Sequence, residues 1–281
     1  MTLNERIIEA TMEWGRDLPG FRPAHAAHAK MFAEAFAEGL SEIGRGGERA
    51  LLLSCLDMAC ILWVDDWFDV RGPGINGDWE ALAGGLGSAL ATTPEALGLS
   101  RLSARFRRAA AHLDEHRLWS ETLADVLRAS REDQRVSRGE RTLSWAEYQE
   151  NGEHNIAVHH TVFSLSLAYG LGLASIAGDL RFRRALRHLC LAMRLRNDLA
   201  SAEKERKEGS LSNGLFVMER YLSPERAFAF VDGERRGYER MLERDLESFA
   251  PSHPFPRVAR VLIGAAERFY QTPNSRYRDD E

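Results

Sequence analysis

Three carboxylates stand close together at the end of a long apolar run. The segment Asp65-Asp66-Trp67-Phe68-Asp69 follows the sequence LLLSCLDMACILWV. In a helix, Asp65 and Asp69 are one turn apart, so their carboxylates share a face about 6 Å apart along the axis. Like charges at this spacing repel and require a compensating cation, and hard oxygen ligands suit Mg²⁺ or Mn²⁺ rather than zinc. Taken alone, such a cluster is more often the solvated end of a helix.

A second group of oxygen donors lies far along the chain at helical spacing. Asn197, Ser201 and Glu205 fall at i, i+4 and i+8 on one stripe, where they offer an amide carbonyl, a hydroxyl and a carboxylate. Arg194, three residues earlier, falls on nearly the same stripe. A charged, solvated helix would explain the following sequence EKERKE, but it would not explain the asparagine and the serine.

Together, the two groups point to a site between two helices. Facing stripes of hard ligands can hold divalent ions, and such ions bind a polyanion such as diphosphate. Asp65-Asp66-x-x-Asp69 resembles the aspartate-rich motif of class I terpene synthases, and Asn197-Asp198-Leu199-x-Ser201-x-x-x-Glu205 resembles their second metal motif, the NSE triad. The resemblance extends over the whole chain.

The resemblance implies a set of roles. The metal ligands would be Asp65, Asp66, Asp69, Asn197, Ser201 and Glu205, holding three Mg²⁺ ions for which Mn²⁺ can substitute. Lys204 matches a family position that contacts diphosphate. Arg276-Tyr277, in the terminal sequence SRYRDD, resembles the Arg-Tyr pair that binds diphosphate when the site closes. With Arg194, these groups would add charge-assisted hydrogen bonds to a prenyl diphosphate, and the enzyme would be a carbon–oxygen lyase acting on phosphates.

One departure from the family pattern concerns the substrate. Bacterial sesquiterpene synthases usually carry a diphosphate-sensing arginine where this chain has Asn151, and no arginine lies between Arg141 and Arg181. Asn151 is therefore a candidate diphosphate contact. The surrounding sequence WAEYQENG is similar to the bacterial ent-kaurene synthases, as are Glu13-Trp14-Gly15-Arg16 and the terminal SRYRDD. This resemblance implies a bicyclic C20 diphosphate of the copalyl type, made by a separate class II cyclase, with linear geranylgeranyl and farnesyl diphosphates as the alternatives.

The reaction that follows ionisation needs an apolar wall that stabilises a carbocation. The chain has no DxDD motif, so the reaction would not start by protonation of an alkene. The aromatic candidates for the wall, which can equally be ordinary core residues, are Trp63, Phe163, Tyr169 and Phe269. His159 and His160 lie in an otherwise apolar helix and could accept a terminal proton or orient a water. The alternative for both is a histidine hydrogen-bonded within the core. Gly152 is expected to loosen this helix beside the pocket.

The whole chain is predicted to be helical, because apolar residues recur at three and four rather than at two. Capping boxes are expected at Thr2–Glu5 and Ser144–Glu147, and hydroxyl-proline starts at Thr93 and Ser223. Helices are predicted near 3–14, 23–40, 48–70, 78–90, 102–115, 118–138, 144–170, 179–207, 212–221, 224–248 and 257–271. We expect one all-α domain covering 1–281, a helical bundle of the class I terpene synthase type.

Composition excludes several classes of protein. Hydrophobic residues make up 44% of the chain and charged residues 28%, as in soluble globular proteins. The net charge of −5 gives no overall attraction to nucleic acid or to anionic membranes. Three cysteines without a CxxC motif indicate reduced thiols and a cytoplasmic protein. No signal peptide or transmembrane helix is expected, and a homodimer is left open.

Two other functions fit parts of the sequence. A prenyl-chain-elongating transferase is also helical and Mg²⁺-dependent, but that family normally carries a second aspartate-rich motif where this chain has Asn197–Glu205. A non-enzymatic helical binding module would not need two stripes of hard ligands. Both are weaker interpretations than a terpene synthase.

Overall fold

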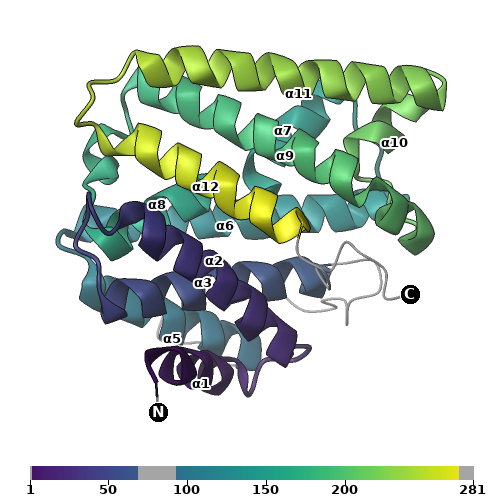
Figure 1. Ribbon diagram of the computed structural model, residues 1–281. Helices are drawn as coiled ribbons and strands as arrows, with labels where there is room; N and C mark the ends of the chain where they lie inside the picture. The colour runs from purple at the N-terminus through teal and green to yellow at the C-terminus, as the bar shows by residue number, and fades with distance from the viewer. Residues whose placement is uncertain (1, 69–92, 272–281) are drawn as a thin grey trace.

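The computed structural model describes residues 2–68 and 93–271, and within these ranges it contains helices and no β-strand. The prediction of an all-α fold is confirmed (Figure 1). The helices are α1 (Leu3–Gly15), α2 (Pro23–Leu40), α3 (Glu48–Phe68), α5 (Pro94–Ala109), α6 (Leu113–Ser137), α7 (Trp145–Asn155), α8 (Val158–Tyr169), α9 (Leu180–Glu208), α10 (Gly214–Glu219), α11 (Pro224–Glu247) and α12 (Pro254–Gln271), with a 3₁₀ turn η1 (Leu173–Ile176).

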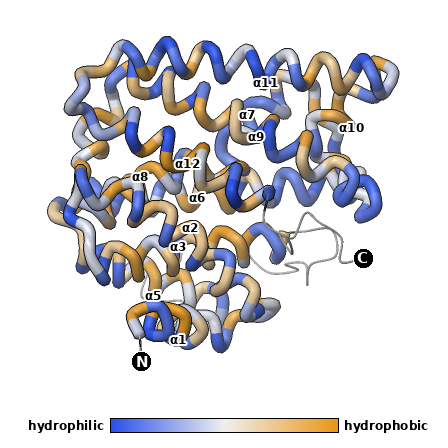
Figure 2. The backbone as a smooth tube through the Cα atoms, viewed as in Figure 1, coloured by the Kyte–Doolittle hydropathy of each residue, from blue (hydrophilic) through white to orange (hydrophobic). Residues whose placement is uncertain are grey.

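Helix α3 lies in the core of the bundle. It packs against α2 and also contacts α6 and α8, whereas α9 packs mainly against α11, which runs along the outside (Figure 1). Most residues of α3 from Ala50 to Phe68 are buried on all sides, which is typical of a core helix. Figure 2 shows hydrophobic positions along α3 and many hydrophilic ones along α11. The apolar run therefore leads from the core to the acidic motif at its end.

Local start signals account for several helix boundaries. At α7, the Glu147 backbone N–H donates to Ser144 Oγ at 3.3 Å, and the Ser144 backbone N–H donates to the Glu147 carboxylate at 2.8 Å. The equivalent pair of bonds is present at Thr2, so both predicted capping boxes are confirmed. Ser223 differs, because its hydroxyl donates to the Glu225 carboxylate at 2.8 Å and caps no backbone N–H.

Two predicted helices need correction. The helix expected at 102–115 begins at Pro94, after the Thr93 cap, and ends at Ala109. The helix expected at 144–170 is two helices, because Ala157 has φ 58°, a left-handed conformation that interrupts the helical hydrogen bonds. This break lies beyond Gly152, where the sequence predicted a loosened helix. The predicted helix at 78–90 lies outside the described residues.

Two predictions about thiols and membranes can also be compared with the structure. Cys55, Cys60 and Cys190 are buried and free, as expected for small core residues. Within 2–68 and 93–271, no helix combines the length and the apolar character that a membrane span requires.

One glycine near the N-terminus leaves room for an aromatic ring from the connection between α1 and α2. A Cβ on Gly15 would lie 2.2 Å from the Phe21 ring. That ring packs edge-on against Trp14 and lies 5.1 Å from the ring of His25, which supports the end of α3 as described below. Gly15 is therefore required by packing.

We predict that Gly15→Ala lowers the free energy of unfolding by about 1–3 kcal/mol, because the Phe21 ring must move out of a packed position. Gly237→Ala is the matched control, since a Cβ at this position would have nothing within 4 Å of it. It should raise stability by about 0.5–1 kcal/mol through helix propensity. Urea unfolding curves measure both. Equal effects of the two substitutions would contradict the packing argument.

Candidate functional site

Two adjoining cavities lie at the ends of α3 and α9. The first, of about 90 Å³, is lined largely by polar side chains of α6 and α9. The second, of about 130 Å³, is lined largely by apolar side chains of α2, α3, α6 and α12. The residues common to both walls are Asp65, Ser130, Asn155, Arg194 and Asn197. The combined space therefore has a polar end and an apolar end.

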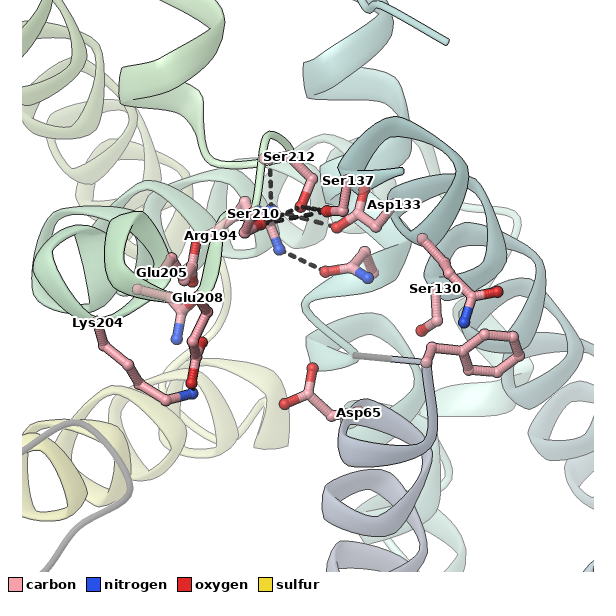
Figure 3. Close-up of a pocket in the computed structure, with 14 residues that line it drawn as sticks. Asp65, Ser130, Asp133, Ser137, Arg194, Lys204, Glu205, Glu208, Ser210 and Ser212 are labelled. Carbon is pink, nitrogen blue, oxygen red and sulfur yellow. Dashed lines mark hydrogen bonds and ion pairs between the residues drawn. The ribbon is translucent and has the colours of Figure 1, made fainter. Parts of the chain in front are cut away.

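The two sequence motifs meet at the polar cavity. Figure 3 shows Asp65 at the end of α3 on one side and Glu205 of α9 on the other. Asn197 also lines this cavity, and its amide nitrogen donates to the Tyr270 hydroxyl at 3.1 Å, so its carbonyl oxygen is the atom suited to a metal. Glu205 accepts a hydrogen bond from the Asn213 side chain at 3.1 Å. Hard oxygen donors thus face one another across a gap, which fits a hard divalent cation.

The oxygen donors do not form a complete metal-coordination site. Among the residues that the structure describes, no three His, Cys, Asp or Glu side chains are grouped closely enough to hold a metal ion. Asp69, the third aspartate of the first motif, lies outside the described residues. Ser201 is fully buried, and its hydroxyl donates to the Asn197 backbone carbonyl at 2.8 Å. Ser201 therefore needs a change of rotamer before it can reach a metal.

Asp66 does not share the surroundings that the sequence suggested. Its carboxylate accepts hydrogen bonds from the Arg22 guanidinium and from His25 Nε2, the latter at 2.8 Å. One residue along a helix is a rotation of 100°, so Asp65 and Asp66 cannot both face the cavity. Asp65 lines it, whereas Asp66 fastens the end of α3 to the start of α2, and its assignment as a metal ligand stays a prediction.

Arg194 is the centre of a buried charge network behind the polar cavity. Its guanidinium donates to the Asp133 carboxylate at 3.3 Å and to the Ser212 carbonyl at 3.0 Å (Figure 3). The remaining partners are Asn155, Tyr148 and Asp198. Burial lowers the pKa of Arg194, but the surrounding carboxylates raise it by a larger amount. The pKa therefore lies well above its usual value. The guanidinium is therefore a permanent positive charge on the cavity wall.

The carboxylates around Arg194 respond to the same burial. Burial raises the pKa of Asp133 to about 7 and that of Asp198 to about 6, while Arg194 opposes both shifts.

A Cβ on Gly152 would lie 3.1 Å from Arg194 Cγ. The role of Gly152 is thus to make room for the arginine, and it does not itself break the helix.

Asn151 and Lys204 occupy different positions relative to the cavity. Asn151 donates to Asp133 at 2.6 Å and to the Ala129 carbonyl at 3.2 Å, so it lies behind Asp133 and is not part of the cavity wall. Asn151 thus supports Asp133, and its predicted contact with diphosphate stays a prediction. Lys204 does line the cavity, where its ammonium group lies 3.3 Å from Glu208.

The two candidate histidines are not among the residues that line either cavity. His160 is fully buried, with Nε2 3.0 Å from Asp57 and Nδ1 3.1 Å from the Thr122 hydroxyl. His159 is half-buried beside His154. Of the four aromatic candidates, Phe269 lines the apolar cavity, whereas the other three pack in the core. Arg276 and Tyr277 lie outside the described residues.

Several residues of the site were not identified from the sequence. Asp133 lies in the polar stretch SREDQ of α6, where spacing does not distinguish it from its exposed neighbours. Asn155 is the last residue of α7, and its side chain accepts a hydrogen bond from Arg194, 39 residues along the chain. Asn213 caps α10 and also donates to the Asp198 carbonyl at 2.9 Å. For Asn213, the sequence does offer a signal, because an amide residue just before a helix is typical of an N-cap.

Residues 58–238 match the model of a protein family described as terpene synthase family 2, C-terminal metal binding. The chain belongs to this family. The matched segment contains both motifs and the Arg194 network. This terpene synthase is accordingly a lyase acting on prenyl diphosphates, which confirms the predicted class of enzyme.

Solved structures show the same fold at low sequence identity. Linalool/nerolidol synthase from Streptomyces clavuligerus, in complex with 2-fluorogeranyl diphosphate, is 16% identical with a TM-score of 0.72, covering 95% of this chain and 96% of that chain. The 2-methylisoborneol synthase from Streptomyces coelicolor A3(2), in complex with Mg²⁺ and geranyl-S-thiolodiphosphate, is 16% identical with a TM-score of 0.73, covering 99% and 93%. Isoprene synthase from grey poplar leaves is 17% identical with a TM-score of 0.72, covering 98% of this chain and 55% of that chain.

We predict that His159 makes the terpene synthase less stable in acid. Burial and the nearby His154 lower the pKa of His159 from 6.5 to about 4, so the unfolded chain binds the extra proton as the pH falls from 6.5 towards 4. Between pH 7 and pH 5, the wild type should lose about 2 kcal/mol more of its unfolding free energy than His159→Gln. Urea unfolding at the two pH values measures this difference. Parallel losses would show that His159 does not contribute.

Proposed function

We propose that this terpene synthase ionises a prenyl diphosphate with Mg²⁺ and cyclises the resulting carbocation. The observation that carries this proposal is the pair of cavities joined through Asp65, Arg194 and Asn197. A prenyl diphosphate has the same division into a charged end and a hydrocarbon end. The diphosphate would lie at the polar end and the chain at the apolar end.

The proposed metal ligands come from both helices. They are Asp65 and Asp69 of the first motif and Asn197, Ser201 and Glu205 of the second. Bound Mg²⁺ supplies charge neutralisation for the leaving diphosphate and a template for its orientation. The Mg²⁺ and thiolodiphosphate bound by the 2-methylisoborneol synthase support the choice of metal.

The basic residues of the chain would share in holding the diphosphate. Arg194 and Lys204 already lie on the wall of the polar cavity, and charge-assisted hydrogen bonds from such groups are the stronger ones. Asp133 and Asn151 would act behind Arg194 by fixing the guanidinium. Arg276 and Tyr277 would bind the diphosphate when the site closes and excludes water.

For the substrate, we propose a bicyclic C20 diphosphate of the copalyl type, with an ent-kaurene-like or related product. Support comes from the similarity of WAEYQENG to the bacterial ent-kaurene synthases and from Asn151 in place of a charged sensor. A separate class II cyclase would supply this substrate. Linear geranylgeranyl and farnesyl diphosphates are the alternatives.

We predict that Asp65→Ala and Asn197→Ala each lower kcat at limiting Mg²⁺ by at least about 100-fold, or ~2.7 kcal/mol in activation free energy, because each removes a metal ligand. Their helical circular dichroism should match the wild type. Glu203→Gln is the matched control on the same helix, since this exposed side chain pairs with Lys207 and does not line the polar cavity. Near wild-type turnover in either alanine variant would contradict the metal assignment for that helix.

We predict a higher kcat/KM for a copalyl-type diphosphate than for linear geranylgeranyl or farnesyl diphosphate. Compared with linear geranylgeranyl diphosphate, a bicyclic substrate has fewer conformers to freeze on binding. Compared with farnesyl diphosphate, its larger apolar body also buries more area, at about 25 cal/mol per Å². Gas chromatography and mass spectrometry of parallel incubations, including both copalyl enantiomers, measure the products. A clear preference for farnesyl diphosphate would remove the diterpene assignment and leave the terpene synthase assignment intact.

A further inference from the structure

A layer of buried polar side chains lies deep in the bundle, where α3, α6 and α8 meet. Asp57 is 1% exposed and His160 is 0% exposed. Asp57 Oδ1 accepts hydrogen bonds from His160 Nε2 at 3.0 Å and from the Trp119 indole at 3.1 Å. The Thr122 hydroxyl completes the layer at 3.1 Å from His160 Nδ1. These four residues form the Asp57 layer.

The Asp57 layer lies directly beneath the apolar cavity. Ile61 of α3 and Val126 of α6 line that cavity, and Asp57 and Thr122 lie four residues before them, so each is one turn deeper on the same helix face. His160 lies in the first turn of α8, just after the break that follows the cavity residue Ile156. Along α3, Asp57 is about 12 Å below Asp65. An extended prenyl chain of fifteen or more carbons spans this depth.

Two oxygen atoms in and beside this layer lack hydrogen-bond partners among the described residues. They are Asp57 Oδ2 and Ser164 Oγ, both on buried side chains. Buried polar atoms are nearly always hydrogen-bonded, and leaving a carboxylate oxygen bare in an apolar core is expensive. Such atoms form sites for internal water, which typically makes about three hydrogen bonds.

We propose that Asp57 is the terminal proton acceptor of the reaction, acting through a water bound to its Oδ2. This inference rests on the proposed function. When the carbocation lies above the layer, a C–H bond next to the cationic carbon breaks and its electron pair forms the C=C bond. The proton passes to the water, and a proton of that water passes to Asp57 Oδ2, so the carboxylate becomes a carboxylic acid and the product is an alkene.

His160 is a positioning residue in this arrangement. A carboxylate offers only acceptors, so His160 Nε2–H donates to Asp57 Oδ1. Together with the Trp119 indole, it holds one oxygen of the carboxylate and leaves the other to face the water. Both ring nitrogens of His160 are engaged within the protein. His160 therefore orients the base and does not itself take the proton.

The test compares Asp57→Asn with a matched control at a second buried carboxylate. Asp245 pairs with His188 Nδ1 at 2.8 Å and with Arg184, and it does not line the apolar cavity. Asp245→Asn therefore makes the same chemical change away from the proposed reaction. Diphosphate release measures ionisation, and gas chromatography with mass spectrometry measures how the cation is quenched.

We expect Asp57→Asn to release diphosphate within threefold of the wild-type rate while the share of the principal alkene falls at least fivefold. Asp245→Asn should leave the product distribution unchanged. An unchanged distribution in Asp57→Asn would overturn the role of Asp57. If the wild type released no diphosphate from any prenyl substrate, the proposed function itself would fail.

If Asp57→Asn does not fold, a pair of variants at His160 tests the role of Asp57 instead. His160→Gln keeps a donor for Asp57, whereas His160→Leu removes it. We expect His160→Gln to retain at least half of the wild-type share of the principal alkene and His160→Leu to lose at least fivefold. The same product distribution in both variants would overturn the proposal.

Discussion

The site depends on one buried positive charge. The Arg194 guanidinium joins α9 to α6 through Asp133, to the end of α7 through Asn155, and to the segment before α10 through Ser212. Removing one partner from a buried ion pair typically costs about 3–5 kcal/mol, because the other charge is left uncompensated. The ends of these helices therefore hold a fixed spacing, and the two sequence motifs face each other at that spacing.

The same network explains why the active site can be polar on one side and apolar on the other. Asp198 is fully buried beside Arg194 and Asp133 is mostly buried there, and their raised pKa values reflect how little water reaches them. The charges are concentrated at the ends of α6 and α9, while the walls below come from the apolar faces of α3 and α6. Charge separation at one end and a hydrocarbon pocket closed to bulk water at the other are both requirements of carbocation chemistry.

Most helices and both motifs could be recognised from the sequence, because each depends on residues that lie only a few positions apart. The capping boxes at Thr2 and Ser144 and the stripe from Asn197 to Glu205 depend on residues a few positions apart. The break at Ala157 could not be predicted, since an alanine in the left-handed region is held by its tertiary surroundings. The sequence also did not reveal that Asp57 and Asp133 take part in buried hydrogen-bond networks. Their partners lie up to 103 residues away, and no local pattern marks a buried acid.

The pairing of Asp66 with the start of α2 has a consequence for protein engineering. The two adjacent aspartates have different surroundings. Asp65 faces the cavity, whereas Asp66 is hydrogen-bonded to Arg22 and His25. The N-terminal segment is therefore connected directly to the end of α3 that borders the cavity. A tag, fusion or directed-evolution change that displaces this segment would act on the end of α3, and so on the position of Asp65 at the cavity, without altering any residue that lines the cavity.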